Sequence, residues 1–189
     1  MKKNLGSLLI ILISFIFFIF LSPHKQPTTP TPNPISSPKA TPFAKGNQVL
    51  GVRTKNTGCL AKDGLQDIDC TPGANIQGIT KDQICVSGYA KSVRNVPESE
   101  KDQVYAEYGI TSHQTGEFEV DHLISLELGG SNDITNLWPE AAEPKPGFHE
   151  KDKVENYLHK QLCNGSIGLE QAQQEISTNW LEVYKEISP

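Results

Sequence analysis

The sequence predicts an α+β domain in which a loop-rich, disulfide-bonded region precedes a short β-element and a helical pair follows it. Residues 118–128 alternate apolar and polar side chains and end at a Gly-Gly pair, which is typical of a strand and a tight turn. Residues 151–162 and 169–187 repeat apolar side chains at helical spacing. Residues 46–78 are rich in Gly, Asp, Asn and Thr and contain two cysteines, which favours loops and short strands held by a bridge.

The N-terminus predicts export from the cytoplasm. Lys2 and Lys3 precede the apolar run Leu8–Leu21, which is the charged-then-apolar order of a secretory signal. The two lysines stay inside, so the rest of the chain is expected to cross the membrane. Counted from Leu5 the run reaches 17 residues, the lower limit for a spanning helix, and its exit lacks a small-x-small cleavage pair. A cleaved signal peptide and an uncleaved anchor over residues 5–21 therefore both stay open, with the anchor favoured.

A proline-rich segment follows the apolar run. From Pro23 to Pro42 the chain holds seven of its 13 prolines among Thr, Ser, Asn and Lys. Such a composition cannot bury a core and predicts an extended, semi-rigid spacer. The chain is thus expected to divide into a signal peptide or anchor (1–22), a Pro-rich linker (23–42) and one folded domain (43–189).

The charge of the chain excludes one class of nucleic-acid binder. The whole sequence has 17 basic and 22 acidic residues, a formal charge of -5. Four of the basic residues and none of the acidic ones precede position 43, so the folded domain has 13 against 22, a charge of -9. A non-specific coat protein for nucleic acid needs the opposite balance. Any phosphate partner must therefore be met by local groups.

Local signals predict the remaining elements. Residues 84–96 contain aromatic and branched side chains and are expected to form a strand followed by a basic turn. Pro97 followed by two acidic residues is typical of a helix start, and this helix is expected to end at Gly109. Gly165 separates the two C-terminal helical segments, which predicts a helical hairpin. Trp138 is expected to lie in the core.

The four cysteines can form two bridges in three ways. Cys59 with Cys70 would close a short local loop, and Cys85 with Cys163 would join the first strand region to the end of the penultimate helix. We favour this pairing because one bridge then lies where the core is poorest and the other connects distant elements. A four-cysteine zinc site is disfavoured, since no two cysteines are two to four residues apart.

Residues 117–153 hold the densest group of side chains that can bind a metal or transfer a proton. Asp121 adjoins His122 at the expected strand, and such a pair can present a hard oxygen to a divalent ion and an imidazole to water. The ordinary pKa of histidine, about 6.5, suits it to accept a proton at neutral pH. Asn136 can hold the backbone of the loop so that the ring of His122 cannot swing. His149, at a helix start, can complete a metal shell.

This pattern resembles the HNH endonucleases, the ββα-metal class. Asp121 and His122 match the opening acidic-His pair, the Gly-Gly pair matches the turn, Asn136 the middle Asn and His149 the closing His. The fourteen positions from His122 to Asn136 are the spacing of the family. Over most of the folded part, the chain is similar to secreted bacterial HNH-type proteins. It departs from the family in lacking a Cys-x-x-Cys knuckle, in having Ser125 where Pro is frequent, and in a longer stretch before His149.

The resemblance implies hydrolysis of a phosphodiester with one divalent ion. Asp121 and His149 would bind the metal, and His122 would be the general base. Asn136 would orient His122 without itself binding the metal. Mg is the expected ion, with Mn, Zn and Ca as alternatives. The implied fold is an HNH-like ββα-metal core with an added N-terminal loop and strand region and a C-terminal helical hairpin.

Substrate contacts, location and one alternative complete the expectations. Arg94 and Lys151 are candidate phosphate contacts, and a solvated salt bridge is the alternative role for each. DNA is the favoured substrate and RNA stays open. The domain is expected outside the cytoplasm, either membrane-anchored through residues 5–21 or secreted. The alternative function is a non-catalytic surface binding module on the same scaffold, in which Asp121 and His122 make only structural hydrogen bonds.

Overall fold

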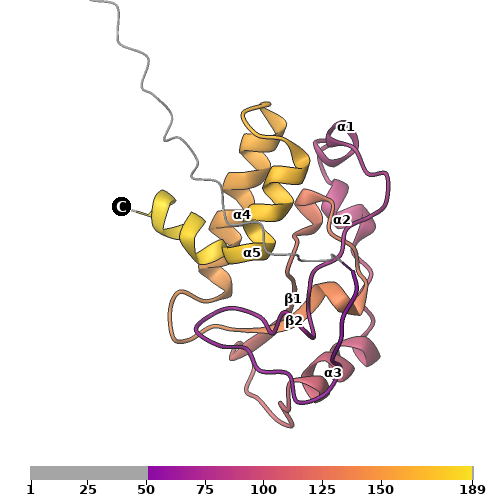
Figure 1. The fold of residues 1–189 in the computed structure, drawn as a ribbon, viewed down its shortest axis with the longest axis vertical. Helices are drawn as coiled ribbons and strands as arrows, with labels where there is room; N and C mark the ends of the chain where they lie inside the picture. Colours follow the sequence, from indigo (N-terminus) through magenta and orange to yellow (C-terminus); the bar gives the residue numbers. More distant parts are fainter. Residues whose placement is uncertain (1–50, 189) are drawn as a thin grey trace, which may run out of the picture. The chain divides into compact units, whose positions relative to one another are not determined.

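The computed structural model describes residues 51–188 (Figure 1). Their buried apolar side chains form two clusters, one that contains Trp180 and one that contains Trp138. The predicted signal peptide or anchor over residues 1–22 and the linker over 23–42 lie outside the described residues. Within the described range, no helix is both long and apolar enough to cross a membrane. A membrane tether therefore stays a prediction from the sequence.

The helices and strands follow a helix–hairpin–helix order, with three short helices before a two-stranded antiparallel sheet and two longer helices after it. Their bounds are α1 Lys81–Ile84, α2 Tyr89–Val93, α3 Glu98–Glu107, β1 Phe118–His122, η1 Leu126–Leu128, η2 Ile134–Asn136, β2 Leu137–Ala141, α4 Phe148–Cys163 and α5 Leu169–Ile187. The α+β class predicted for the domain is confirmed at this level.

The strand predicted over residues 118–128 is shorter than expected. It ends at His122, which lies opposite Leu137 of β2. The chain then leaves the sheet because Ser125 caps the 3-10 helix η1, its Oγ accepting the backbone N–H of Glu127 at 3.2 Å. Alternation of apolar residues beyond position 122 therefore reflects burial in a loop and not a continued strand.

The second strand, β2, contains the tryptophan that the sequence places in the core. Trp138 is 1% exposed, which confirms its predicted place in the core. Pro139 pairs with Val120 inside the strand. A proline cannot donate to a ladder, but it is tolerated here because β2 has a free outer edge within the two-stranded sheet.

The strand predicted over residues 84–96 is wrong, since this region forms the short helices α1 and α2. At the start of α1 the backbone N–H of Thr80 donates to Gln83 Oε1 at 3.0 Å, as in a capping box. Gly88 adopts φ 82° immediately before α2, a conformation that suits glycine. Helix capping and this turn override the strand propensity of the branched side chains.

The later helices agree well with the sequence pattern. α3 begins directly after Pro97, and α4 begins at Phe148, slightly earlier than predicted. α5 covers the predicted residues 169–187, although Asn179 has non-helical φ/ψ and interrupts it. Gly165, at φ 83°, lies in the turn between α4 and α5, which pack side by side as the predicted hairpin (Figure 1).

Both predicted disulfides are confirmed. Cys59 bonds Cys70 within the apolar cluster that contains Trp138. Cys85 bonds Cys163 and joins the end of α1 to the end of α4. Two disulfides in a chain of this size indicate an oxidising compartment.

Candidate functional site

The end of β1, the loop that follows it and the first turns of α4 bring four of the predicted residues together. Lys151 Nζ of α4 lies 2.6 Å from Asp121 Oδ2 and 2.8 Å from the carbonyl oxygen of His122. Asn136, directly before β2, binds the backbone just after His122. Residues separated by 30 positions therefore meet at one end of the sheet.

Asn136 fixes the loop between the strands. Its Oδ1 accepts the backbone N–H groups of Ile124 (2.9 Å) and Ala74 (3.2 Å). Its Nδ2 donates to the carbonyl oxygens of Ile124 (3.0 Å) and Ser131 (2.8 Å). The side chain is fully buried and its amide is occupied by backbone groups. Asn136 thus fixes the backbone of the loop that follows His122.

The Gly-Gly pair is required by the close packing of the same loop. Gly129 has φ 77°, which an L side chain rarely adopts. A Cβ at Gly130 would lie only 1.7 Å from the carbonyl oxygen of Ile124. Neither glycine can be replaced without moving the backbone that Asn136 holds.

His122 is buried and oriented through one ring nitrogen. The residue is 1% exposed, and its Nε2 lies 3.2 Å from Asn132 Oδ1. Asn132 Oδ1 also accepts the N–H of Asn95, and its Nδ2 donates to the carbonyl oxygen of Val93 at 2.8 Å. Because these bonds fix the orientation of the Asn132 amide, the assigned tautomer has the proton on Nε2 of His122. Sequence reasoning did not identify Asn132.

The other ring nitrogen of His122 is a free acceptor. Nδ1 is buried, and no group within residues 51–188 makes a hydrogen bond to it. Burial lowers the pKa of His122, and this effect outweighs the nearby Asp121 carboxylate, which acts to raise it. The imidazole is therefore neutral at pH 7, with the lone pair of Nδ1 available for a proton.

Arg94 lies near this histidine. It is exposed, directly after α2, and its positive charge acts to lower the pKa of both His122 and Asp152. The expectation of a phosphate contact at Arg94 is compatible with this place. It stays a prediction, because no ligand is present.

Lys151 occupies a different place from the one predicted. The side chain is fully buried, and its Nζ binds Asp121 Oδ2 (2.6 Å), Glu155 Oε1 (2.5 Å) and the carbonyl oxygen of His122 (2.8 Å). The oxygen Oε2 of Glu140 is 4.0 Å away. A direct phosphate contact and a solvated salt bridge are both wrong for this residue, because the ammonium is enclosed by the chain's own oxygens.

The electrostatics of this cluster separate its carboxyl groups. Burial acts to raise the pKa of Asp121, but the Lys151 ammonium outweighs it and the net pKa is below the usual range. Burial raises the pKa of Glu140 well above the usual range, and that of Glu155 is also raised by burial. Asp121 is thus the fully ionised partner of Lys151 at neutral pH. Glu140 and Glu155 were not identified from sequence, although Lys151 and Glu155 have the i, i+4 spacing of a helical pair.

Two further carboxyl groups lie beside this cluster. Burial raises the pKa of Glu119 to about 7, with the charges of Asp121 and Asp152 adding to the effect. Burial also raises the pKa of Asp152, and the neighbouring His149 acts to lower it. Glu119 is half-buried. His149 itself is exposed on the first turn of α4.

The residues described do not preform the metal site that the HNH resemblance implies. Asp121 is already bound by Lys151, and nothing places His149 beside it. Within the described part of the chain, no three His, Cys, Asp or Glu side chains are grouped so that they could hold an ion. The donor types of Asp121 and His149 suit a divalent ion, but their number and arrangement do not fit. No chemical step is therefore assigned to a metal.

The two remaining histidines of the described range differ from each other. His113 is exposed and packs on the ring of Tyr105. His159, in contrast, is half-buried. Its Nδ1 lies 2.7 Å from the carbonyl oxygen of Glu127, and its Nε2 lies 3.6 Å from Cys163 Sγ. His159 therefore helps to fasten α4 to the loop after β1.

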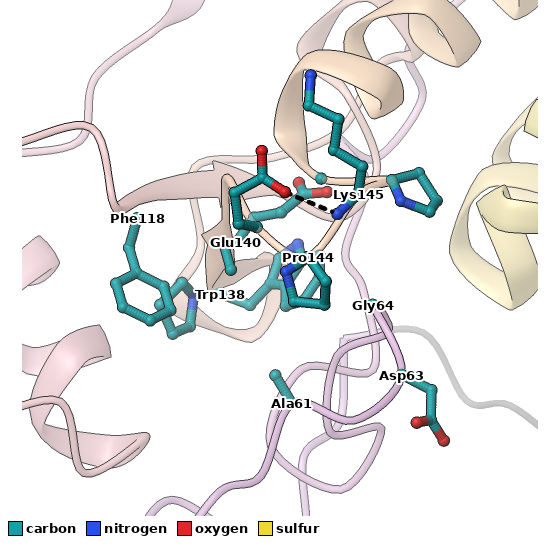
Figure 2. A pocket seen from close by; sticks show the side chains of 13 residues that line it. Ala61, Asp63, Gly64, Phe118, Trp138, Glu140, Pro144 and Lys145 are labelled. Atoms are coloured by element: carbon teal, nitrogen blue, oxygen red, sulfur yellow. Dashed lines mark hydrogen bonds between the residues drawn. The ribbon is translucent and has the colours of Figure 1, made fainter.

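A cavity of about 520 Å³ lies beside β2, away from Nδ1 of His122. Figure 2 shows its walls, with Ala61, Asp63 and Gly64 on one side and Trp138, Pro144 and Lys145 on the other. Glu140 is the one member of the Lys151 cluster that lines it, and Phe118 lies at its edge. The cavity thus touches the Lys151 cluster but contains none of the predicted catalytic residues.

Comparisons with protein-family models, with curated proteins and with solved structures found no match. The argument for function consequently depends on the geometry around His122 and on the HNH-like residues of the sequence.

Proposed function

We propose that this protein is an extracytoplasmic HNH-type endonuclease that hydrolyses phosphodiester bonds with His122 as general base. One observation carries the proposal: a buried, neutral imidazole has Nε2 fixed by Asn132, whereas Nδ1 has no hydrogen-bond partner within residues 51–188. An oriented imidazole with a free acceptor nitrogen is what a general base needs. The topology supports it, because a β-hairpin followed by a helix carries the matching residues.

In this proposal Nδ1 of His122 takes a proton from the attacking water. The Asp121 carboxylate acts to raise the pKa of the ring and so stabilises the imidazolium that forms. Asn132 keeps the ring in one orientation during this transfer. Arg94 is an exposed cation close enough to His122 to influence its pKa, and it binds a phosphate of the substrate. Because Nδ1 of His122 is buried, a substrate has to displace the groups that cover this nitrogen to reach it.

A divalent ion belongs to this proposal through the HNH resemblance. If bound, such an ion, with Mg favoured, would stabilise charge on the departing oxygen. Since Asp121 and His149 do not form a ready site, ion dependence is tested directly and not assumed. DNA is the favoured substrate, and RNA is tested beside it.

The location follows from the N-terminus and the cysteines. The two disulfides suit an oxidising compartment outside the cytoplasm. We propose that residues 5–21 either anchor the chain in the membrane or are removed after export. Cell fractionation tests this choice: the full-length chain in the membrane fraction supports the anchor, and a shortened chain in the medium contradicts it.

A second candidate is favoured by the burial of the same residues. His122 is 1% exposed and Asp121 is bound by Lys151. Both observations also suit a non-catalytic binding module, in which the pair has a structural role. The experiment below separates this candidate from the nuclease.

The test is digestion of plasmid DNA and of RNA by the purified full chain, with Mg²⁺, with Mn²⁺ and with chelator. We expect cleavage by wild-type protein, and a loss of at least about 100-fold for His122→Ala, the usual contribution of a general base. His113→Ala is the matched control and should cleave like wild type, because His113 is exposed and makes no contact with the site residues. Equal cleavage with and without His122 would overturn the mechanism. Absence of cleavage under every condition would favour the binding module.

A further inference from the structure

The two disulfides differ in how far solvent reaches them. Cys59 and Cys70 are each 1% exposed and belong to the apolar cluster that contains Trp138. Cys85 and Cys163 are both only half-buried, and they lie at the ends of α1 and α4. Thiol–disulfide exchange requires that an attacking thiolate reach a sulfur atom of the bridge. The Cys85–Cys163 bridge is therefore the more accessible of the two to an external thiol.

His159 holds a ring nitrogen against one sulfur of this bridge. It precedes Cys163 by one turn of α4, and its Nε2 lies 3.6 Å from Cys163 Sγ. Its Nδ1 lies 2.7 Å from the carbonyl oxygen of Glu127. Because a carbonyl oxygen can only accept, the proton of the neutral ring is assigned to Nδ1. The lone pair of Nε2 is thus left for a proton on the side of the sulfur.

This placement distinguishes the two sulfur atoms chemically. In exchange, the sulfur that is not attacked departs as a thiolate, and it leaves faster when the pKa of its thiol is lower. A protonated imidazole or a lysine beside a cysteine lowers that pKa. Lys81 of α1 is near the same end of α4, since its Nζ is 3.8 Å from a Cβ built on Gly165, two residues after Cys163. Cys163 is therefore the better leaving group, and Cys85 is the sulfur to attack.

We propose that the Cys85–Cys163 bridge is a thiol–disulfide exchange site for an external dithiol, with His159 as its proton-transfer group. One thiol of the dithiol loses its proton to Nε2 of His159 and attacks Cys85 Sγ. The S–S bond breaks, its electron pair goes to Cys163 Sγ, and His159 passes the proton to this sulfur. A mixed disulfide then joins Cys85 to the dithiol.

The second thiol of the dithiol completes the exchange. It attacks the dithiol's own sulfur in the mixed disulfide, and its proton goes to Cys85, which leaves as a thiol. The dithiol is oxidised by two electrons to a cyclic disulfide, and the two cysteines are reduced by the same two electrons. The reverse sequence, with an external disulfide as oxidant, forms the bridge. This inference holds whether or not the chain cleaves nucleic acid.

The test follows reduction of the folded full chain by dithiothreitol in wild type, His159→Gln and His113→Gln. Samples are quenched with an alkylating reagent, and mass spectrometry of the peptides identifies which cysteines have been reduced. His113→Gln is the matched control, because His113 is exposed and its ring packs on Tyr105 and Phe118.

In wild type we expect Cys85 and Cys163 to be reduced at least about tenfold faster than Cys59 and Cys70, because access differs between the bridges. His159→Gln should slow this reduction at least about tenfold, since the proton-transfer group is lost. The control should stay within about twofold of wild type. A merely structural His159 would give the opposite sign, because loosening the end of α4 would make the bridge easier to reduce.

A second measurement needs no variant and decides the case in which His159→Gln does not fold. Glutathione, a monothiol, traps the mixed disulfide in wild type, and we expect it on Cys85 with Cys163 as the free thiol. The proposal is overturned if glutathione is found mainly on Cys163, or if Cys59 and Cys70 are reduced as fast as the other pair. Unchanged or faster reduction of folded His159→Gln overturns it as well.

Discussion

Asp121 and His122 are neighbours in the chain, yet the two side chains lie in opposite situations. The carboxylate of Asp121 is bound by a buried ammonium at 2.6 Å, and its pKa is held low. The imidazole of His122 is buried, but its Nδ1 has no hydrogen-bond partner within the described range, and its pKa is lowered by burial. The Asp121 carboxylate is thus already paired with a cation, whereas Nδ1 of His122 has its lone pair free.

The geometry of a strand explains how one step in sequence produces this difference. Successive side chains of β1 point to opposite faces of the sheet. Asp121 therefore meets Lys151 of α4, whereas the ring of His122 meets Asn132 in the loop before β2. The comparison teaches that a matching sequence motif does not give its two residues the same chemical availability.

Removal of the Lys151 ammonium should have the largest effect on stability. Lys151→Met leaves Asp121 and its neighbouring carboxyls buried without a counter-charge, and we expect a loss of about 3–5 kcal/mol in the free energy of unfolding. Urea unfolding at neutral pH measures it. Lys153→Met, which removes a pair between an exposed ammonium and the buried Glu150 carboxylate at one end of α4, should cost no more than about 1 kcal/mol. Equal losses for the two variants would mean that the buried cluster is not the stabilising feature claimed here.

Loss of the loop anchor should have the next largest effect. Asn136→Ala leaves the backbone N–H groups of Ile124 and Ala74 without their acceptor, and we expect a loss of about 2–3 kcal/mol. Asn156→Ala is the control, because this exposed amide contacts only its own helix. Chemical denaturation of both variants is the measurement, and a loss for Asn136→Ala as small as the control's would contradict its positioning role.

A smaller effect is expected where His122 is oriented. Asn132→Ala removes the bond to Nε2 and the bond to the carbonyl of Val93, and should cost about 1 kcal/mol. It should also lower the pKa of His122 further, because the bond to Asn132 favours the charged ring. An NMR titration of the histidine signals measures this shift. An unchanged or raised pKa would show that Asn132 does not hold the ring.

The smallest effect concerns the rim of the charged cluster. The pKa of Glu119 is about 7 in the folded protein and 4.5 as its ordinary value, so the folded state binds more protons between these values. Stability from this group is present at low pH and is lost as pH rises through about 7. The Tm of Glu119→Gln minus the Tm of wild type should therefore increase as pH rises from about 4.5 to about 7. A difference in Tm that does not change with pH would contradict the raised pKa.

Much of the fold could be predicted from the sequence because local patterns decide it. The helical stripes of α4 and α5 and the cysteine spacing gave the hairpin and both disulfides. The strand expected over residues 84–96 failed because a capping box at Thr80 and a glycine turn at Gly88 outweigh the branched side chains. Such caps compete with propensity over only a few residues, and single residues then decide the outcome.

The site was less predictable, because its decisive contacts join distant segments. The motif placed Asp121, His122 and Asn136 at one end of the sheet, and Asn136 holds the loop there. Nothing in the local pattern shows that Lys151 would lie buried against Asp121, or that Asn132 would orient His122. Burial and long-range pairing convert an expected phosphate contact into an internal cation.

The most direct test of the central claim is an NMR measurement of the His122 ring nitrogens in the ¹⁵N-histidine-labelled full chain, assigned by comparison with His122→Ala. We predict a proton on Nε2, a bare Nδ1 and a pKa below the ordinary value of about 6.5. A proton on Nδ1 at neutral pH, or a pKa above the ordinary value, would contradict the account in which His122 is a neutral base with a free Nδ1 and Asp121 is paired with Lys151.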